Sequence, residues 1–171
     1  TINKVDTGRF DVEPLWEFIG LEDARVVRWD NNLYLCGVRR DTTTHGEGRM
    51  ELSRIDDNRE VSRTRMPTTG ANNTYCEKNW MPVLDRPFHW VKWTNPTEVV
   101  YYDRTTNITT TTFISDKVIP NIPDQRGSSH VIPYGDYYIA ITHEVDLIKP
   151  IVGQKDATYM HRFVVWDRNF N

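Results

Sequence analysis

The sequence has few cysteines, no long apolar run and no cluster of basic residues, and each absence narrows the class of protein. Two cysteines, Cys36 and Cys76, are too few for a disulfide framework and lack zinc-site spacing, so we expect both to be reduced packing residues. No apolar run is long enough to span a bilayer and no signal-peptide pattern is present, which predicts a cytoplasmic protein without a membrane partner. The basic residues are scattered and the net charge is -3, so we expect no nucleic-acid partner.

Amphipathic helical periodicity is nearly absent as well, which argues against a helical fold. Short alternating or wholly apolar runs recur instead, bounded by Asp, Asn, Gly or Pro, and this pattern is typical of strands joined by turns. Six tryptophans and eight tyrosines supply large side chains for packing between sheets. Because 171 residues fit one ordinary domain, we predict a single all-β domain.

Three pairs of strand-like runs flank short turn sequences and predict three hairpins. The first turn, Asp30-Asn31-Asn32, has side chains that tolerate the left-handed backbone of a tight hairpin. The paired runs are residues 25–29 with 33–38, 81–84 with 88–93, and 130–133 with 137–141. Further strands are expected at residues 49–55, 97–102, 110–114 and 162–166, with the threonine run at 109–112 on an outer edge.

The three turns align Asp30, Asp85 and Gly135 at a period of about fifty residues, which is typical of propeller blades. The repeats run approximately over residues 21–74, 75–124 and 125–171. We therefore predict a β-propeller-like fold with about three four-stranded blades. Because a propeller usually needs four to eight blades to close, we expect the domain to be partial, completed by self-association or by the remainder of a longer chain.

Polar side chains precede the first strand of each repeat, and the first strands of a propeller line its centre. The repeat places at matching positions Glu22 with Asp23, Glu77 with Lys78, and Ser128 with Ser129. One interpretation is that these side chains only cap and solvate strand ends. The other is that they converge into a site, and three aligned sets favour it; we expect Asp23, Lys78 and Ser129 to share one cleft.

The stretches GLEDARVVRWDNNLYL, YCEKNWMPV, RGSSHVIPYGDYYIAITHE and YMHRFVVWD resemble the five-bladed propellers of family 130 glycoside phosphorylases and hydrolases. They are also similar to propeller domains attached to some bacterial glycosyltransferases. The resemblance covers roughly residues 20–171. The catalytic aspartate of the family lies in an acidic-Asp-Pro-Arg motif, which is matched here by Glu22-Asp23-Ala24-Arg25 with alanine in place of proline.

The resemblance implies cleavage of β-linked oligosaccharides, mannose-containing ones among them, by phosphate or by water. Asp23 is the expected acid, kept protonated by Glu22 and an apolar mouth. Inorganic phosphate is the expected co-substrate, with no cofactor and no metal, and the matching phosphate-binding residues are Arg40, Lys78, His143 and Arg162. If water attacks, a second carboxylate is needed, and Glu77 and Glu144 both remain candidates.

Other candidate binding residues lie beside these. The pairs His143-Glu144 and His161-Arg162 end and begin strands, so both pairs are expected to face one mouth. Asn79 is a candidate for bonds to sugar hydroxyls, and Arg25 and Ser129 are further candidates for binding the substrate or phosphate. Trp80, Trp90 and Trp93 are interpreted as core residues or sugar platforms, with at least one exposed. Two functions stay open at this point: a glycoside phosphorylase or hydrolase, and a non-catalytic glycan-binding or glycosyltransferase-associated propeller domain.

Overall fold

The computed structural model describes residues 19–69, 75–148 and 156–171, and within these ranges the chain forms strands, turns and loops without a helix. The all-β prediction is therefore confirmed. The same ranges hold no helix with the length and apolar character needed to cross a membrane.

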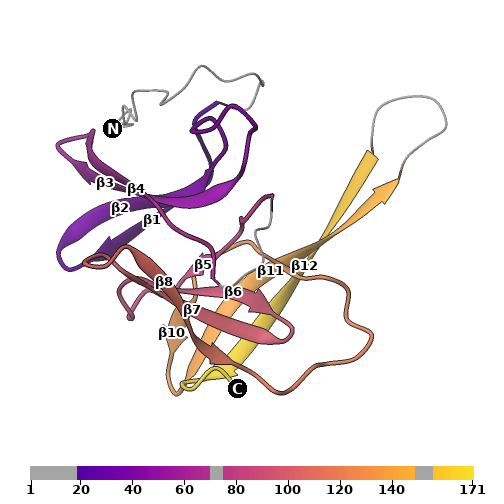
Figure 1. Ribbon diagram of the computed structural model, residues 1–171. Coiled ribbons are helices and arrows are strands. Elements are labelled where there is room, and N and C mark those ends of the chain that lie inside the picture. The colour runs from indigo at the N-terminus through magenta and orange to yellow at the C-terminus, as the bar shows by residue number, and fades with distance from the viewer. Residues whose placement is uncertain (1–18, 70–74, 149–155) are drawn as a thin grey trace.

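Three four-stranded antiparallel sheets make up the structure, one within each predicted repeat (Figure 1). Sheet 1 consists of β1 (Leu21–Trp29), β2 (Asn32–Arg39), β3 (Arg49–Asp56) and β4 (Arg59–Arg65). Sheet 2 consists of β5 (Met81–Pro82), β6 (His89–Thr94), β7 (Thr97–Asp103) and β8 (Ile108–Ile114). Sheet 3 consists of β9 (Arg126–Gly127), β10 (Ile132–Tyr134), β11 (Tyr137–Ile148) and β12 (Asp156–Asp167).

Sheets 1 and 2 are simple meanders, in which each strand pairs with the next along the chain. The turn chemistry explains them: Asp30 and Asn31 take φ values of 48° and 59°, as the predicted tight hairpin requires. The same conformation at Asp57 and Asn58, with φ values of 45° and 61°, forms a hairpin that places β4 beside β3. The threonine-rich β8 lies at the edge of sheet 2, as predicted.

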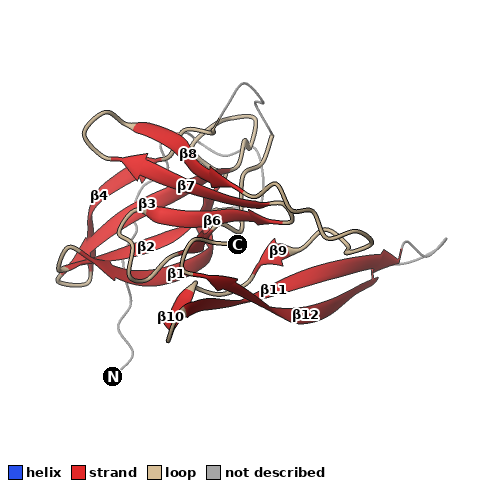
Figure 2. Cartoon of the chain, turned by 90° about the horizontal axis from the view of Figure 1, so that it is seen from below, coloured by secondary structure: helices blue, strands red, loops and turns tan. Residues whose placement is uncertain are grey.

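Sheet 3 departs from the meander because its first strand is interrupted. Both β9 and β10 pair with β11, and the segment between them leaves the ladder. The predicted strand at 130–133 therefore begins only at Ile132, and β9 precedes it. The long β11–β12 hairpin extends beyond the other two sheets (Figures 1 and 2).

Two aromatic-rich clusters hold the sheets face to face, with sheet 2 in the middle. Between sheets 1 and 2, the rings of Trp29 and Trp90 meet edge to face with centroids 5.0 Å apart. Between sheets 2 and 3, Trp166 packs beside Val91 and Val99, and its Nε1 donates to Oγ1 of Thr97 at 2.9 Å. Each buried indole removes a large apolar surface from water, so these clusters set the stacking of the sheets.

The first strands of the three sheets meet at the centre of the molecule. Trp29 Nε1 of β1 donates to the carbonyl of Val83, just after β5, at 3.2 Å. Val83 in turn forms a parallel bridge with Val131, just before β10. His130 Nε2 lies 2.9 Å from the carbonyl of Val26, which returns to β1. The residues that precede these strands are thereby brought to one end of the molecule.

Candidate functional site

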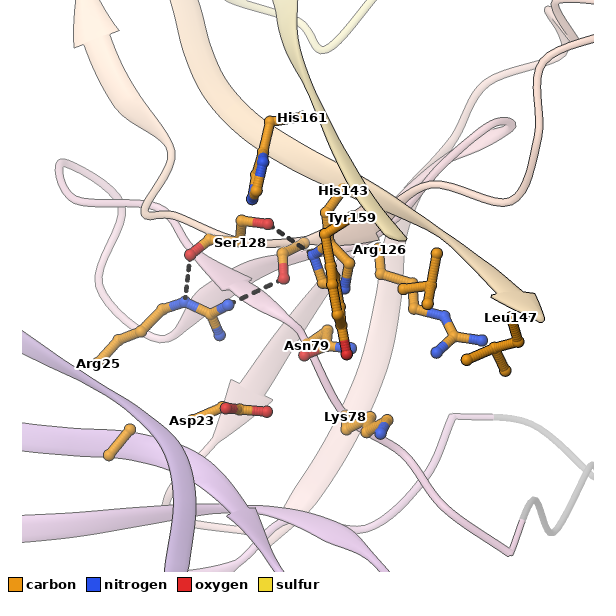
Figure 3. Close-up of a pocket in the computed structure, with 13 residues that line it drawn as sticks. Asp23, Arg25, Lys78, Asn79, Arg126, Ser128, His143, Leu147, Tyr159 and His161 are labelled. Atoms are coloured by element: carbon orange, nitrogen blue, oxygen red, sulfur yellow. Dashed lines mark hydrogen bonds between the residues drawn. The ribbon is translucent and has the colours of Figure 1, made fainter. Parts of the chain in front are cut away.

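A pocket of about 540 Å³ lies where the chain enters the first strands, and we call it the central pocket (Figure 3). Asp23, Lys78 and Ser128 all line it, and each lies seven positions before an aligned turn residue. The repeat thus accounts for their convergence. The lining residues that the structure describes are Asp23, Ala24, Arg25, Lys78, Asn79, Arg126, Gly127, Ser128, His143, Val145, Leu147, Tyr159 and His161.

A β-bulge aims Asp23 into the central pocket. The pairing of β1 with β2 shifts between Glu22 and Arg25, and Asp23 takes a left-handed φ of 51°. A bulge of this kind inserts a residue into the strand and redirects its side chain. Glu22, by contrast, is not part of the pocket lining, and its buried Oε1 has no hydrogen-bond partner.

The surroundings of Asp23 differ from those predicted. We expected an apolar mouth with Glu22 alongside, whereas the exposed Asp23 carboxyl shares its pocket with Lys78, Arg126 and His143. The prediction of an apolar environment was therefore wrong. Glu22 does not accompany Asp23 because side chains alternate along the strand and the bulge redirects Asp23.

Arg25 ties the three sheets together under the central pocket. Its guanidinium donates to the backbone carbonyls of Gly127 at 2.9 Å and Ser128 at 3.4 Å (Figure 3), and also to that of Trp80 at 3.3 Å. Burial lowers the pKa of Arg25 from its ordinary value, and the nearby Cys36 and Asp23 oppose this effect. Because its donors are directed at the backbone, we assign Arg25 a positioning role.

Ser128 and His143 form the closest polar contact in the central pocket. The serine Oγ lies 2.6 Å from Nδ1 of His143. Burial lowers the pKa of His143, and the positive charges of Arg126, His161 and Arg25 lower it further. His143 and His161 are direct cross-strand partners on β11 and β12, which is why both face this pocket.

Ser129 is placed differently from Ser128, although the two are adjacent. Its hydroxyl donates to the carbonyl of His130 at 2.7 Å and accepts the amide of Ile141 at 2.8 Å. Both bonds hold the interrupted edge of sheet 3, and Ser129 does not line the central pocket. The prediction that Ser129 shares a cleft with Asp23 and Lys78 is therefore wrong, and the adjacent Ser128 takes that place.

Strand alternation sends the two members of each pair, His143-Glu144 and His161-Arg162, to opposite faces of sheet 3. Glu144 and Arg162 lie on the opposite face of sheet 3 from His143 and His161, with Arg162 Nη2 2.9 Å from Oε1 of Glu144. Gln125 Nε2 donates to the same carboxylate at 2.8 Å. The hydrogen bond from Arg162 lowers the pKa of Glu144. The prediction that both pairs face one mouth was wrong, and neither Glu144 nor Arg162 lines the central pocket.

Arg40 and Glu77 belong to a neighbouring pocket of about 370 Å³, which we call the outer pocket. It shares Lys78, Asn79, Arg126 and Gly127 with the central pocket, so the two adjoin along this wall. The buried Glu77 accepts a hydrogen bond from Trp80 Nε1 at 3.2 Å and lies 3.5 Å from the Lys92 ammonium. Its carboxylate is therefore engaged within the wall of the outer pocket.

No family model, curated protein or solved structure matches the chain. Within residues 19–69, 75–148 and 156–171, no three His, Cys, Asp or Glu side chains are grouped as metal ligands.

Arg126 and Tyr159 are polar lining residues that the sequence prediction missed, and the position of each in the sequence carried a signal. Arg126 lies two positions before Ser128 and faces the same pocket. Tyr159 lies two positions before His161, and residues two apart on a strand share a face. The central pocket therefore combines one carboxylate, several nitrogen donors and an aromatic side chain. Such a set suits an anionic group held beside a hydroxyl-rich ligand.

Proposed function

We propose that the three sheets are blades of a β-propeller and that the central pocket is its ligand site. Three features support the proposal: the meander topology of sheets 1 and 2, the face-to-face stacking, and the meeting of the first strands. On sheet 3, the face turned away from Trp166 carries His161 of the central pocket and, farther along β12, Phe163 and Val165, which are 74% and 57% exposed. Blades bury such faces against neighbours, so we propose that a further blade, from a second copy or from further sequence, covers this face.

We further propose that the protein is a glycoside phosphorylase acting on β-linked oligosaccharides. The observation that carries this proposal is the composition of the central pocket, where Asp23 is the single carboxylate among the described lining residues. Hydrolysis by the usual mechanism requires a second carboxylate as base or nucleophile. Phosphorolysis requires one acid and a bound phosphate. Glu77 and Glu144, the two candidates for a second carboxylate, are held by Lys92 with Trp80 and by Arg162 with Gln125.

The proposed reaction uses the pocket residues as follows. Asp23 donates its proton to the glycosidic oxygen as the bond from that oxygen to the anomeric carbon breaks. A phosphate oxygen forms the new bond to the anomeric carbon and yields a sugar 1-phosphate. Lys78 and Arg126 attract the phosphate by charge, and the imidazoles of His143 and His161 offer N–H donors to it. Arg25 acts only by fixing the three strand ends beneath them.

A second function, non-catalytic glycan binding, is favoured by one observation. The Asp23 carboxyl is exposed and lies among cationic side chains, whereas a catalytic acid is usually found in an apolar setting. A carboxylate in the observed setting is well suited to accept hydrogen bonds from sugar hydroxyls. In this case the chain is a glycan-binding accessory domain, such as one associated with a glycosyltransferase.

Product analysis separates the two functions. The chain is incubated with β-linked manno- and gluco-oligosaccharides, with and without inorganic phosphate, and the products are identified by mass spectrometry. A phosphorylase releases sugar 1-phosphate only with phosphate, and Asp23→Asn abolishes release because an amide cannot donate the proton. Lys78→Ala should weaken the dependence on phosphate, because its charge serves the anion. The control is Lys117→Ala, a change to an exposed lysine outside both pockets, which should leave that dependence unchanged. Glycan binding without any product, in both the wild type and Asp23→Asn, contradicts the phosphorylase and supports the accessory domain.

A further inference from the structure

The outer pocket contains an exposed tryptophan that the proposed reaction does not use. Trp93 is 42% exposed and lines this pocket, whereas Trp90 on the same strand is fully buried in the core. The pairing of β6 with β7 shifts between Val91 and Trp93. This bulge at Lys92 interrupts the alternation of side chains along β6, as the bulge in β1 does at Asp23. Two bulges on different sheets thus aim one side chain into each of the adjoining pockets.

Two of the four cationic side chains in the described lining of the outer pocket are paired with its own carboxylates, Lys92 with Glu77 and Arg126 with Asp124 at 3.8 Å, which weakens its attraction for an anion. Glu77 and Asp124 place two carboxylates among its cationic side chains. Lys92 is held in the wall, with its Nζ 3.5 Å from Glu77 Oε1 and 3.9 Å from Glu98 Oε2. It also donates to Oγ1 of Thr69 at 2.8 Å. Among the described lining residues, the central pocket has one carboxylate, Asp23, whereas the outer pocket has two.

A tryptophan face beside donors and acceptors matches the chemistry of a sugar ring. The ring offers an apolar C–H surface for the indole and hydroxyls for amides and carboxylates. Asn79 belongs to both pockets and takes a left-handed φ of 64°. It therefore lies on the route that a linear ligand would take between them. A volume of about 370 Å³ lies within the range of small-ligand pockets.

We propose that the outer pocket is a second carbohydrate subsite, with Trp93 as its stacking platform. It binds a sugar unit of the same oligosaccharide whose reacting end occupies the central pocket. The preferred ligand is accordingly a chain of three or more units rather than a disaccharide. The inference rests on the proposed function to the extent that the central pocket binds sugar, but it does not require catalysis.

Calorimetry with ligands of graded length tests the subsite. β-Linked manno- and gluco-oligosaccharides of two to five units are titrated into the full chain. The affinity is expected to rise with chain length, and Trp93→Ala is expected to lower it by about 3- to 10-fold for the longer ligands, the range for one aromatic contact. Disaccharide affinity should stay unchanged. Trp93→Tyr should retain most of the gain, because it keeps a ring.

The matched control is Tyr134→Ala, which removes an aromatic side chain that is 74% exposed and lines neither pocket. It should not alter any affinity. Equal losses for short and long ligands in Trp93→Ala, or none for either, would overturn the subsite while leaving the central pocket intact. Absence of all sugar binding in the wild type would overturn both proposals. Chain-length dependence that is lost in Trp93→Ala, in a protein that forms no product, would uphold the subsite and reject only the phosphorylase.

Discussion

Ser128 Oγ and His143 Nδ1 lie 2.6 Å apart, joining the interrupted first strand of sheet 3 to the middle of β11. A hydrogen bond at one ring nitrogen fixes the orientation of the imidazole, which leaves Nε2 as the ring atom for a ligand. Ser128 precedes an aligned turn by the same interval as Asp23 and Lys78. The repeat therefore places Ser128 where its hydroxyl contacts an imidazole of the central pocket.

His143 is expected to titrate below the ordinary histidine pKa of about 6.5. Burial is the main cause, and the charge of Arg126 is the largest electrostatic contribution. Arg126→Ala should therefore raise the pKa of His143, while Arg168→Ala, a change outside the central pocket, should not. Proton NMR of the imidazole resonances between pH 4 and pH 9 measures both. An unchanged pKa in Arg126→Ala would show that the two side chains do not interact.

The same shift predicts how stability depends on pH. Because the folded state disfavours the protonated imidazole, the unfolded chain takes up this proton first as the pH falls below about 6.5. The wild type should therefore lose stability more steeply than His143→Gln between pH 6.5 and the lower folded pKa. Urea unfolding of both proteins across this window measures the difference. Parallel curves would contradict the lowered pKa.

Arg25→Ala should destabilise the fold by about 2–4 kcal/mol, because carbonyls of Trp80, Gly127 and Ser128 lose their donor. Arg25→Lys should recover little, since one ammonium group cannot reproduce the forked geometry. Arg28→Ala, an exposed arginine on the same strand, is the matched control and should change stability by no more than about 0.5 kcal/mol. Urea unfolding compares the three. Full recovery by lysine would reject the positioning role of Arg25.

Gly127→Ala should cost about 2–3 kcal/mol, because a Cβ at this position meets the carbonyl oxygen of Asn79 and the side chain of Met81. The backbone carbonyl cannot move aside without shifting the wall between the two pockets. Gly135→Ala should cost only about 1 kcal/mol, from its left-handed φ of 55°, since no atom lies within 4 Å of the added carbon. Thermal unfolding of the two variants tests the order. Equal losses would contradict the close approach at Gly127.

Cys76 should react with iodoacetamide well before Cys36. Cys36 is fully buried and accepts a hydrogen bond from Trp90 Nε1 at 3.0 Å, and burial raises the pKa of its thiol to about 12. Thiolate is the reactive form, so at pH 8 only one thiol should be modified in the folded protein. Mass spectrometry with Cys76→Ser as control identifies it. Rapid modification of Cys36 in that variant would show that its core cluster opens readily.

The position of the central pocket was accessible from the sequence because it follows from the repeat. Turns at Asp30, Asp85 and Gly135 fix where each first strand ends, and a common fold then brings equivalent residues together. Alternation could also have separated His143 from Glu144, since neighbours on a strand point to opposite faces. Applying that rule would have shown that His143 and Glu144 cannot both face one pocket, and likewise His161 and Arg162.

Other features could not be read from the sequence. The bulges that redirect Asp23 and Trp93 arise from the register between strands, which no residue type in β1 or β6 announces. The choice of Ser128 over Ser129 depends on where the first strand of sheet 3 breaks, and a shift of one residue reverses the face. Strand β4 was missed because its sequence, REVSRTR, is almost entirely polar.

The central claim is that the pocket lined by Lys78, Arg126 and His143 binds phosphate, and NMR titration with inorganic phosphate tests it most directly. Phosphate should shift the imidazole resonances of His143 and His161 in a saturable manner and raise the pKa of His143, because an anion stabilises the imidazolium. Lys78→Ala should weaken the response. His89, which packs against Tyr101 with ring centroids 4.8 Å apart and lines neither pocket, should not respond. No shift at His143, or equal shifts at His143 and His89, would contradict the claim.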